Sequence, residues 1–386
     1  MHFFNLFHPY FIFCNIHNIF NSNNPETACS YFGGFLNNQC RDYFSIIKNN
    51  DINNSGSCEI YLDHNENINN DYISAKVRPF INFFIEHNKF YDSFSVLLNK
   101  IETFHDNLDY IDYHNKFSNA SYTLGITPFA DLTSDEYKEY LGISGVLELG
   151  AKNMCTKQGK ESGSYPLSVD WRAKNAVTPV KDQGQCGSCW SFSASGAIEG
   201  IYAIKSGSLV SLSEQQMVDC SYSYGNHGCN GGLMEDAFTY VHDNGLSAEL
   251  DYPYTATSSR FSSCKSFTPV TYIDGCVMVM QNELELTYAV SRQPVSVSIE
   301  ADSKSFQLYK SGVYDNPDCG TTLDHGVLAV GYGTDSGTGK DYWLVKNSWS
   351  ASWGDAGYIK IARNSVATSI QGQCGIAMDA SYPVLN

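Results

Sequence analysis

Residues 183–190 read QGQCGSCW and place two cysteines three positions apart among glycines. A C-x-x-C pair is compatible with three chemistries: half of a zinc site, a thioredoxin-like redox pair, or a reactive thiol beside a separate structural cysteine. Each chemistry requires different partners elsewhere in the chain, so the surrounding sequence decides between them.

The zinc and redox interpretations find few partners. A structural zinc site needs a second ligand pair at short spacing, and the sequence has no other C-x-x-C. Cys220, His227 and Cys229 leave a metal site open as an alternative, although their spacing matches no usual one. A redox pair is expected at a strand-to-helix junction of a βαβ unit, and the downstream sequence lacks that pattern. We therefore expect neither a metal ion nor another cofactor.

A nucleophilic cysteine needs a base, a group that orients the base, and donors for an oxyanion. The chain offers His325 in LDHGV, Asn347 in KNSW, and Gln183 just upstream of the cysteine pair. A single histidine or asparagine is usually a satisfied polar group, so these candidates gain weight only from their occurrence together.

The sequence after residue 168 changes from helical to β-rich. CWSFSASGAIEGIYAIKSG predicts a buried helix from about Ser188 to Gly207, and DAFTYVHDNG predicts a second helix. Beyond about residue 268, the runs PVSVSIEA, GVLAVGYG, DYWLVKNSW and GYIKIAR read as strands with glycine turns between them. This order predicts an α+β unit with two lobes.

Composition narrows the function class. The chain has 386 residues, and its formal net charge of −17 argues against a nucleic-acid partner, because phosphate binding needs clustered Lys and Arg. It has no run of eighteen or more apolar residues, so we expect no membrane span. The 13 cysteines favour an oxidising compartment, and their odd number leaves at least one thiol free.

The sequence divides into three segments. Residues 1–75 are rich in Asn, and we expect an atypical, poorly ordered extension there. Its first twenty residues make a poor signal peptide, so a targeting segment and an atypical extension both stay open. Residues 76–140 read as helical, with apolar residues at 97, 101, 104, 108 and 111 on one face. Thr133 or Ser134, with Glu136, predicts a capped short helix, and TKQGKESGSYP predicts an exposed linker.

From about residue 80 to residue 386 the chain closely resembles the papain-like cysteine proteases, in the branch around cathepsin L. The motifs that carry this resemblance are VDWR, TPVKDQGQCGSCW, GCNGGLM, LDHGVLAVGYG and KNSW, in this order. The C-G-[SA]-C-[WY] signature, with a histidine and an asparagine well downstream, is typical of that family. The resemblance implies a cysteine endopeptidase with a papain-like catalytic domain over residues 164–386, preceded by an inhibitory propeptide and linker over residues 76–163.

The resemblance also assigns catalytic roles. Cys189 is the expected nucleophile, at a helix N-terminus that favours the thiolate, with a protonated His325 beside it. Asn347 is expected to orient the imidazole. Gln183 and the Cys189 backbone N–H are expected to form the oxyanion hole. Trp349 is expected to cover the bond between His325 and Asn347, and a purely packing role for it stays open.

The resemblance further implies a substrate pocket. Its expected lining is Gly231, Gly232, Leu233, Met234, Ser298, Leu323, Asp324, Gly326 and, at the floor, Asp379. An acid at the end of an apolar pocket can pair with an Arg of the substrate, so we expect both hydrophobic residues and Arg to be accepted. The alternative is that the Asp379 carboxylate turns to solvent and has no effect.

The family's disulfides assign six cysteines. The implied pairs are Cys186–Cys229, Cys220–Cys264 and Cys319–Cys374. Cys276 has no family partner, and we expect a reduced, buried thiol. The cysteines at 14, 29, 40, 58 and 155 stay unassigned.

The segment before the catalytic domain departs from the family's propeptide pattern. Phe104, Asn107, Ile111 and Asn115 match it, whereas Val96 and Lys100 do not. In the motif that follows, which reads Gly125, Thr127, Phe129 and Asp131, Thr127 replaces the usual Asn. The helical pro-fold is therefore expected to persist, with the strength of inhibition open.

By resemblance, the propeptide crosses the active cleft in the reverse of the substrate direction and loosens in acid as carboxylates protonate. The mature enzyme is then expected to begin near Tyr165. Its expected partners are polypeptide substrates, its own propeptide and cystatin-type inhibitors, and the expected form is a monomer. Potential glycosylation sites at Asn53 and Asn119 agree with a lysosome, an equivalent acidic vacuole or secretion.

The catalytic domain shows one visible departure from the family. Ser350 follows KNSW at a position where the family usually has Gly. If the backbone there requires a positive φ, serine costs about 1 kcal/mol or more.

Overall fold

The computed structural model describes residues 79–80, 82–91, 94–143, 153–160, 163–258, 264–364 and 370–386. The predictions for residues 1–75, including Asn53 and the four cysteines there, lie outside the described residues. The chain forms two compact units, residues 1–106 and 107–386. In the described part of the first unit, Phe80 and Phe83 pack on Phe104, with ring centroids 5.3 Å and 4.9 Å apart. No described helix is long and apolar enough to cross a bilayer.

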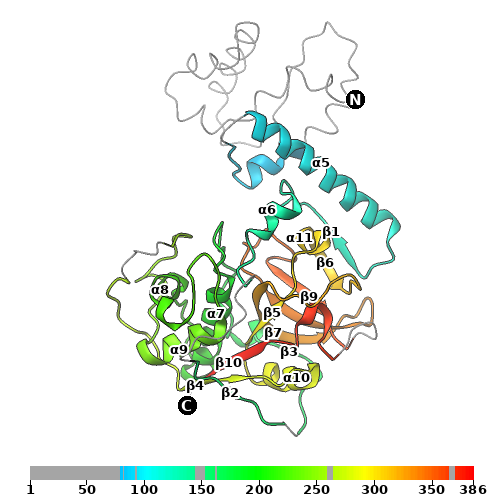
Figure 1. The fold of residues 1–386 in the computed structure, drawn as a ribbon. Helices are drawn as coiled ribbons and strands as arrows, with labels where there is room; N and C mark the ends of the chain where they lie inside the picture. The colour runs from blue at the N-terminus through cyan, green and yellow to red at the C-terminus, as the bar shows by residue number, and fades with distance from the viewer. Residues whose placement is uncertain are drawn as a thin grey trace, which may run out of the picture. The chain divides into compact units, whose positions relative to one another are not determined.

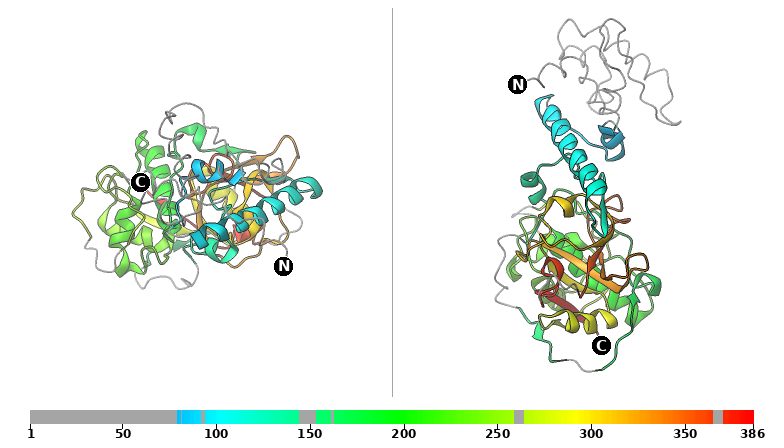
Figure 2. Two further views of the ribbon diagram at one scale, coloured as in Figure 1. Left: turned by 90° about the horizontal axis from the view of Figure 1, so that it is seen from above. Right: turned by 90° about the vertical axis from the view of Figure 1, so that its right-hand side faces the viewer.

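Three helices form one lobe of the second unit, α7 (Cys189–Ser206), α8 (Glu214–Cys220) and α9 (Met234–Asn244). They lie together beside the strands in Figure 1 and in the view from above in Figure 2. Helix α7 ends where Gly207 adopts a φ of +77°, which a residue with a side chain rarely adopts. Ser213 caps α8 by accepting a hydrogen bond from the Gln216 N–H. The two helices predicted in this region are confirmed.

A mixed sheet forms the other lobe. Its strands follow the order β1-β6-β9-β8-β7-β5-β10-β4-β2, with β3 also paired to β7. The strands of the catalytic domain are β3 (Val169–Asp170), β4 (Gly275–Met278), β5 (Val295–Ile299), β6 (Tyr309–Tyr314), β7 (His325–Thr334), β8 (Asp341–Lys346), β9 (Tyr358–Ala362) and β10 (Ala380–Val384). All five residues of β5 are buried, because the strand lies in the middle of the sheet. The two-lobed α+β arrangement predicted from the sequence is confirmed.

Short helices complete the catalytic domain. They are α10 (Glu283–Arg292), α11 (Lys304–Gln307) and the 3-10 turns η2 (Arg172–Lys174), η3 (Tyr222–Tyr224) and η4 (Gln373–Gly375). Helix α7 lies between α9 and strand β7, so its apolar face joins the two lobes in one core. That position explains why nearly every residue of α7 is buried.

The segment before residue 164 is less helical than its sequence predicts. It contains α5 (Phe94–Phe117), β1 (Tyr122–Leu124), α6 (Ser134–Lys138) and β2 (Thr156–Lys157). Thr133 caps α6 in a capping box with Glu136, as predicted. Strand β1 pairs with β6, and β2 pairs with β4, so both ends of the sheet are strands of the pro-region.

Asparagine side chains of α5 hold the extended part of the pro-region. The Asn107 Nδ2 group donates to the carbonyl oxygens of Ala130 (2.8 Å) and Leu132 (3.2 Å). Asn115 makes a two-way bond with the backbone of Leu124, at 2.9 and 3.0 Å. These two positions of the propeptide pattern therefore fix the chain that leaves the helix.

The structure contains four disulfides among its described residues. Three are the implied pairs Cys186–Cys229, Cys220–Cys264 and Cys319–Cys374. The fourth joins Cys155 to Cys276. The prediction that Cys276 is a reduced thiol is therefore wrong. The parallel pairing of β2 with β4 brings Cys155, directly before β2, next to Cys276 within β4.

Candidate active site

Cys189 is the first residue of α7 and is fully buried. Its sulfur accepts a hydrogen bond from the Gly326 N–H at 3.3 Å. It is the free cysteine among the described residues. A thiol at the N-terminus of an 18-residue helix lies where the helix dipole favours an anion.

His325 and Asn347 come from neighbouring strands. His325 begins β7 and Asn347 directly follows β8, which pairs antiparallel with β7. The His325 Nε2 atom lies 2.8 Å from Asn347 Oδ1, and the Ser348 N–H donates to the same oxygen at 2.8 Å. Because this oxygen only accepts, the Nε2 atom of His325 carries a proton. The other ring nitrogen, Nδ1, is buried and has no hydrogen-bond partner among the described residues.

Trp349 covers this histidine. Its indole stacks on the imidazole of His325, with ring centroids 4.4 Å apart and planes 19° apart. Phe129 and Tyr137 of the pro-region contact the same indole edge-on, at 5.0 and 5.6 Å. The indole is almost fully buried, so water has little access to the bond between His325 and Asn347 from this side.

Gln183 is buried, and several bonds fix its side-chain amide. The Nε2 group donates to the carbonyl oxygens of Cys186 and Tyr140, both at 2.9 Å. The Oε1 atom accepts from the Ser348 hydroxyl at 2.6 Å. The amide of Gln183 therefore presents a donor that a pro-region carbonyl occupies.

Residues 140–143 of the pro-region fill the site. The Gly142 carbonyl accepts from the Gly232 N–H at 3.1 Å, and the Ile143 N–H donates to the Asp324 carbonyl at 3.0 Å. A Cβ atom on Gly142 would lie 2.2 Å from the Gly187 carbonyl oxygen, so only glycine fits there. Ile143 is 3% exposed and packs in one apolar cluster with Leu233, Met234 and the cysteine.

Burial shifts both ionisable groups of the site towards neutrality. It raises the pKa of Cys189 to about 11, with the backbone N–H groups of Gly326 and Gly142 acting in the opposite direction. It lowers the pKa of His325 to about 4, against the hydrogen bond to Asn347. In this covered state the thiol and the imidazole are both uncharged at neutral pH. The thiolate–imidazolium pair expected from the sequence concerns the uncovered site and stays a prediction.

Two groups of the residues predicted to line the pocket lie together: Leu233 and Met234 pack in one apolar cluster with Ile143, and Ser298 of β5 contacts Asp379. Ser298 of β5 lies opposite Gly326 of β7 in the strand register. The Ser298 hydroxyl donates to the Asp379 carboxylate at 2.6 Å, and its N–H donates to the Asp379 carbonyl at 2.9 Å. Burial raises the pKa of Asp379. The side chain of Leu323 lies near Gly375, in the segment that leads to Asp379.

Sequence reasoning did not find Glu235. This residue directly follows the GGLM motif, and its side chain is buried with neither carboxylate oxygen hydrogen-bonded among the described residues. Burial, and then the charge of Asp379, raise its pKa to about 8. An acidic residue in the first turn of a helix usually lies at the surface, so the sequence carried no signal for this burial.

A buried network of charges behind the site was also not predicted. The Lys181 ammonium lies 3.0 Å from a carboxylate oxygen of Glu199 and 2.6 Å from one of Glu214. The Lys346 ammonium donates to the Thr178 hydroxyl at 2.9 Å, and Thr178 donates to Glu199 at 2.6 Å. Lys181 lies two residues before Gln183 and Lys346 directly precedes Asn347, so the network holds the chain next to both residues.

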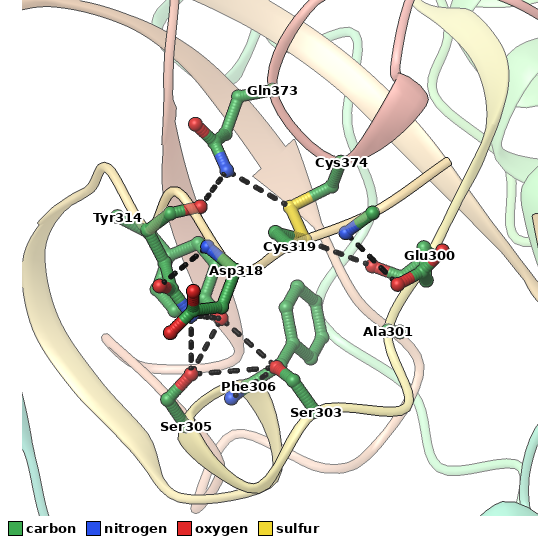
Figure 3. The surroundings of a disulfide bond; sticks show 12 residues. Glu300, Ala301, Ser303, Ser305, Phe306, Tyr314, Asp318, Cys319, Gln373 and Cys374 are labelled. Carbon is green, nitrogen blue, oxygen red and sulfur yellow. Dashed lines mark hydrogen bonds between the residues drawn. A yellow bond between two sulfur atoms is a disulfide. The ribbon is translucent and has the colours of Figure 1, made fainter. Parts of the chain in front are cut away.

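The disulfide Cys319–Cys374 lies beside Glu300 (Figure 3), at the start of the loop of residues 300–308 that contacts the pro-region. The Ser303 and Ser305 hydroxyls in this loop lie 3.0 and 2.7 Å from the Tyr314 hydroxyl. The Tyr137 hydroxyl of the pro-region donates to the carbonyl of Ala301 in the same loop, at 2.9 Å.

Thr127, which replaces the usual Asn of the pro-region motif, also bonds the catalytic domain. Its hydroxyl donates to the Gln307 carbonyl at 2.9 Å. The Gln307 side chain returns hydrogen bonds to the carbonyls of Phe129 (2.8 Å) and Leu132 (2.9 Å). The substitution therefore keeps a polar contact between the two parts.

The cysteines of the alternative zinc site are not available as metal ligands. Cys220 and Cys229 belong to two different disulfides, so neither offers a thiolate. Across the described ranges, no group of three or more His, Cys, Asp or Glu residues is placed to hold a metal ion.

Two parts of the chain match families of known proteins. Residues 165–384 match the family described as "Papain family cysteine protease", and residues 80–137 match "Cathepsin propeptide inhibitor domain (I29)". The chain belongs to the papain family. The family match begins at the residue where the mature enzyme is expected to start.

Two papain-family relatives in plants illustrate the similarity. The "Probable cysteine protease RD21B" of Arabidopsis thaliana is 52% identical over 288 residues, which cover 74% of this chain and 60% of the relative. The "Oryzain beta chain" of Oryza sativa subsp. japonica is 49% identical over 286 residues, which cover 72% of this chain and 60% of the relative. The chain thus spans about three-fifths of the length of these curated relatives.

Two solved precursors of the papain family share the fold. "Recombinant stem bromelain precursor" has a TM-score of 0.73 at 40% identity and covers 81% of this chain and 99% of that one. "Digestive procathepsin L 3 of Tenebrio molitor larval midgut" has a TM-score of 0.72 at 39% identity, covering 80% and 99%.

Proposed function

We propose that this chain is the precursor of a cysteine endopeptidase that hydrolyses polypeptides. The observation that carries the proposal is the placement of Cys189 at the start of α7 together with the hydrogen bond from His325 to Asn347, 2.8 Å long. Family membership agrees with this reading, and the proposed catalytic domain is residues 164–386, with residues 76–163 as propeptide and linker.

The proposed reaction follows from these positions. After a proton passes from Cys189 to His325, the thiolate attacks the peptide carbonyl carbon and a tetrahedral oxyanion forms. The Gln183 side-chain N–H and the Cys189 backbone N–H donate to this oxyanion. His325 then protonates the leaving amine, and a thioester remains on the sulfur. Water, deprotonated by the same histidine, hydrolyses the thioester and restores the thiol.

Residues 140–143 support the proposal that the chain is made as a zymogen. The Tyr140 carbonyl occupies the Gln183 donor that the oxyanion needs, and Ile143 fills the apolar pocket. A substrate therefore has to displace this segment before it reaches the sulfur. The same displacement removes the burial that holds Cys189 and His325 neutral.

Acid is the proposed trigger for this displacement. The pKa of His325 is about 4 in the covered state, whereas an uncovered histidine has a pKa of about 6.5. Transfer of the Cys189 proton to His325 on uncovering leaves the number of bound protons unchanged, so this pair takes up a proton only at a pH low enough to keep the uncovered thiol protonated as well. In that range uncovering becomes easier as the pH falls.

Neighbouring carboxyl groups contribute less to the trigger. Burial raises the pKa of Asp324 to about 7, which opposes release in acid to the extent that the residue becomes exposed. Its carboxylate accepts the Ala301 N–H at 2.8 Å, and this bond lies within the catalytic domain and outlasts propeptide release. The ion pair of Lys138 with Asp302 breaks in acid, but both side chains are largely exposed and contribute at most about 1 kcal/mol.

The proposed location is an acidic vacuole, a lysosome or the extracellular space. The proposed further partners are cystatin-type inhibitors, and the proposed active form is a monomer. Four disulfides support an oxidising route. Asn119, in its N-A-S sequence, lies exposed and accessible to glycosylation.

One experiment separates this function from its rivals. The purified precursor is acidified and then titrated with an epoxide inhibitor of thiol proteases, while cleavage of a fluorogenic dipeptide is followed. Loss of activity at one inhibitor per enzyme is expected. Cys189→Ser should keep the fold but retain less than about a hundredth of the activity, because serine lacks thiolate character. A non-catalytic homologue or a zinc-binding module would show no activity to titrate.

A further inference from the structure

The disulfide Cys155–Cys276 joins the two parts that maturation separates. Cys155 lies in the linker, ten residues (165 − 155) before the expected mature start at Tyr165. Cys276 lies in strand β4 of the catalytic domain and is 2% exposed. A peptide-bond cut near Tyr165 therefore leaves the propeptide covalently attached through sulfur.

Backbone pairing reinforces this attachment. Thr156 and Lys157 form β2 and pair in parallel with Val277 and Met278 of β4. The Gln158 N–H then donates to the Met278 carbonyl at 2.8 Å. The linker is thus the last strand at one edge of the catalytic sheet.

Two more hydrogen bonds extend the attachment on either side of the strand. The Met154 N–H donates to the Thr239 hydroxyl at 3.3 Å, before β2. The Tyr288 hydroxyl donates to the Gly163 carbonyl at 2.7 Å, after it. Residues on both sides of β2 therefore contact the catalytic domain, at Met154 and at Gly163.

The inhibitory segment lies a short distance along the chain from this tether. Only 12 residues (155 − 143) separate Ile143, in the substrate pocket, from Cys155. A short linker keeps a tethered group at an effective concentration of about a millimolar. After a cut near Tyr165, residues 140–143 would therefore rebind to the site much faster than a substrate at ordinary concentration could bind there.

We propose that cleavage near Tyr165 alone yields a two-chain, disulfide-linked and still inhibited protein, and that thiol–disulfide exchange at Cys155–Cys276 releases the propeptide. The inference rests on the proposed function of the chain as a zymogen. It adds a second requirement to acidification, namely a reductant of the thiol class in the compartment where the enzyme acts.

The release step balances as ordinary exchange with a dithiol. A thiolate of the dithiol attacks the sulfur of Cys155, which is less buried than Cys276. A mixed disulfide forms, and the Cys276 thiolate leaves and takes up a proton. The second thiol of the reductant then displaces Cys155. Two electrons pass to the protein, which gains two thiols, and the reductant becomes a disulfide.

The test starts from a precursor in which residues 159–162 are replaced by the factor Xa recognition sequence Ile-Glu-Gly-Arg, so that the cut does not depend on self-processing. In a Cys189→Ser background, the cut protein should run as one species on a denaturing gel without reductant and as two species with it. The matched control, which also carries Cys155→Ser and Cys276→Ser, should run as two species in both gels. Two species from the first protein without reductant would refute the tether.

The second arm measures activity of the same pair with Cys189 intact, in thiol-free buffer under inert gas. After the cut and dilution to nanomolar concentration, the tethered enzyme should show less than about a tenth of the activity that a reductant then produces, since dilution does not weaken an intramolecular inhibitor. The untethered variant should reach its full activity by dilution alone and gain little from reductant. Equal activity of the two proteins before reductant overturns the proposal.

Two checks keep the outcomes distinct. If the double variant fails to fold, Cys155→Ser alone replaces it as the control, because it leaves the buried Cys276 unchanged. If neither protein is active even with reductant, the proposed endopeptidase function fails, whereas the gel arm still decides whether the tether exists.

Discussion

The indole of Trp349 lies nearly parallel to the imidazole of His325, with 4.4 Å between ring centroids and 19° between planes. The edge of the same indole receives Tyr137 of the pro-region, at 5.6 Å and 73°. One side chain therefore touches both the proposed catalytic base and the segment that inhibits it. A change in how the pro-region packs on Trp349 therefore directly alters the surroundings of His325.

Tyr137→Phe tests how strongly the catalytic domain holds this pro-region residue, without altering the mature enzyme. The change removes the hydroxyl that donates to the Ala301 carbonyl and leaves that carbonyl unpaired in a buried place. We expect the propeptide to bind more weakly by about 1 kcal/mol, roughly fivefold, so self-conversion of the precursor should start at a higher pH. The control is Tyr113→Phe, at an exposed position of α5. Equal conversion profiles for the two variants would show that the hydroxyl contributes nothing.

The covered thiol should react slowly over a wide pH range. With a pKa of about 11 for Cys189 and about 4 for His325, both groups are neutral between these values in the precursor. Uncovering allows proton transfer, and the resulting thiolate should be alkylated by iodoacetamide at least about tenfold faster at pH 6, even though its intrinsic nucleophilicity falls with its pKa. The label is located by mass spectrometry of the peptide that contains Cys189. Equal alkylation rates before and after activation would contradict the covered state.

Ser350→Gly should stabilise the catalytic domain. Ser350 has a φ of +65°, as the departure from the family's Gly suggested, and a Cβ atom is disfavoured in that region. Its hydroxyl accepts the Ser352 N–H at 3.3 Å, which offsets part of the strain. We expect the free energy of unfolding to rise by about 1 kcal/mol, measured by denaturant titration of the Cys189→Ser precursor. Ser350→Ala separates the two effects, because it keeps the strain and loses the hydroxyl, and should destabilise.

Asp379, the proposed acid at the floor of the substrate pocket, should make specificity depend on pH. As Asp379 ionises, an Arg in the pocket gains a partner in a medium of low dielectric. We therefore expect the kcat/KM ratio of Arg-Arg to Phe-Arg dipeptide substrates to rise between pH 4 and pH 7. Asp379→Ala should abolish the rise. Glu235→Gln should leave it intact, because the pKa of Glu235 is about 8 and its side chain stays neutral in this range. A flat ratio in the wild type would contradict the role of Asp379.

Sequence patterns predicted the chemistry of the site better than its surroundings. The motifs around Cys189, His325 and Asn347 are local and dense, and the structure brings the histidine and asparagine together as expected. Burial of Glu235 and pairing of Cys155 were not predictable in this way. Each depends on which segment packs against which, and a two-residue strand such as β2 leaves no periodic signal in the sequence.

The dependence of short strands on their packing partners also explains why the predicted secondary structure of the pro-region was partly wrong. Residues 76–140 carry a helical pattern in α5, and its extension to residue 140 missed β1. Three residues cannot establish an alternation by themselves, and β1 exists because β6 offers a partner. The pKa values of the covered site were likewise not predictable, because they follow from the burial of the sulfur and the imidazole in the folded chain.

The pro-region strands β1 and β2 stand at the two open borders of the catalytic sheet. Without them, β6 and β4 would each present a row of unsatisfied backbone N–H and C=O groups to other molecules. Such borders are templates for association between identical chains. The pro-region covers both borders, and as long as the disulfide holds β2, one of the two stays covered after the peptide bond near Tyr165 is cut.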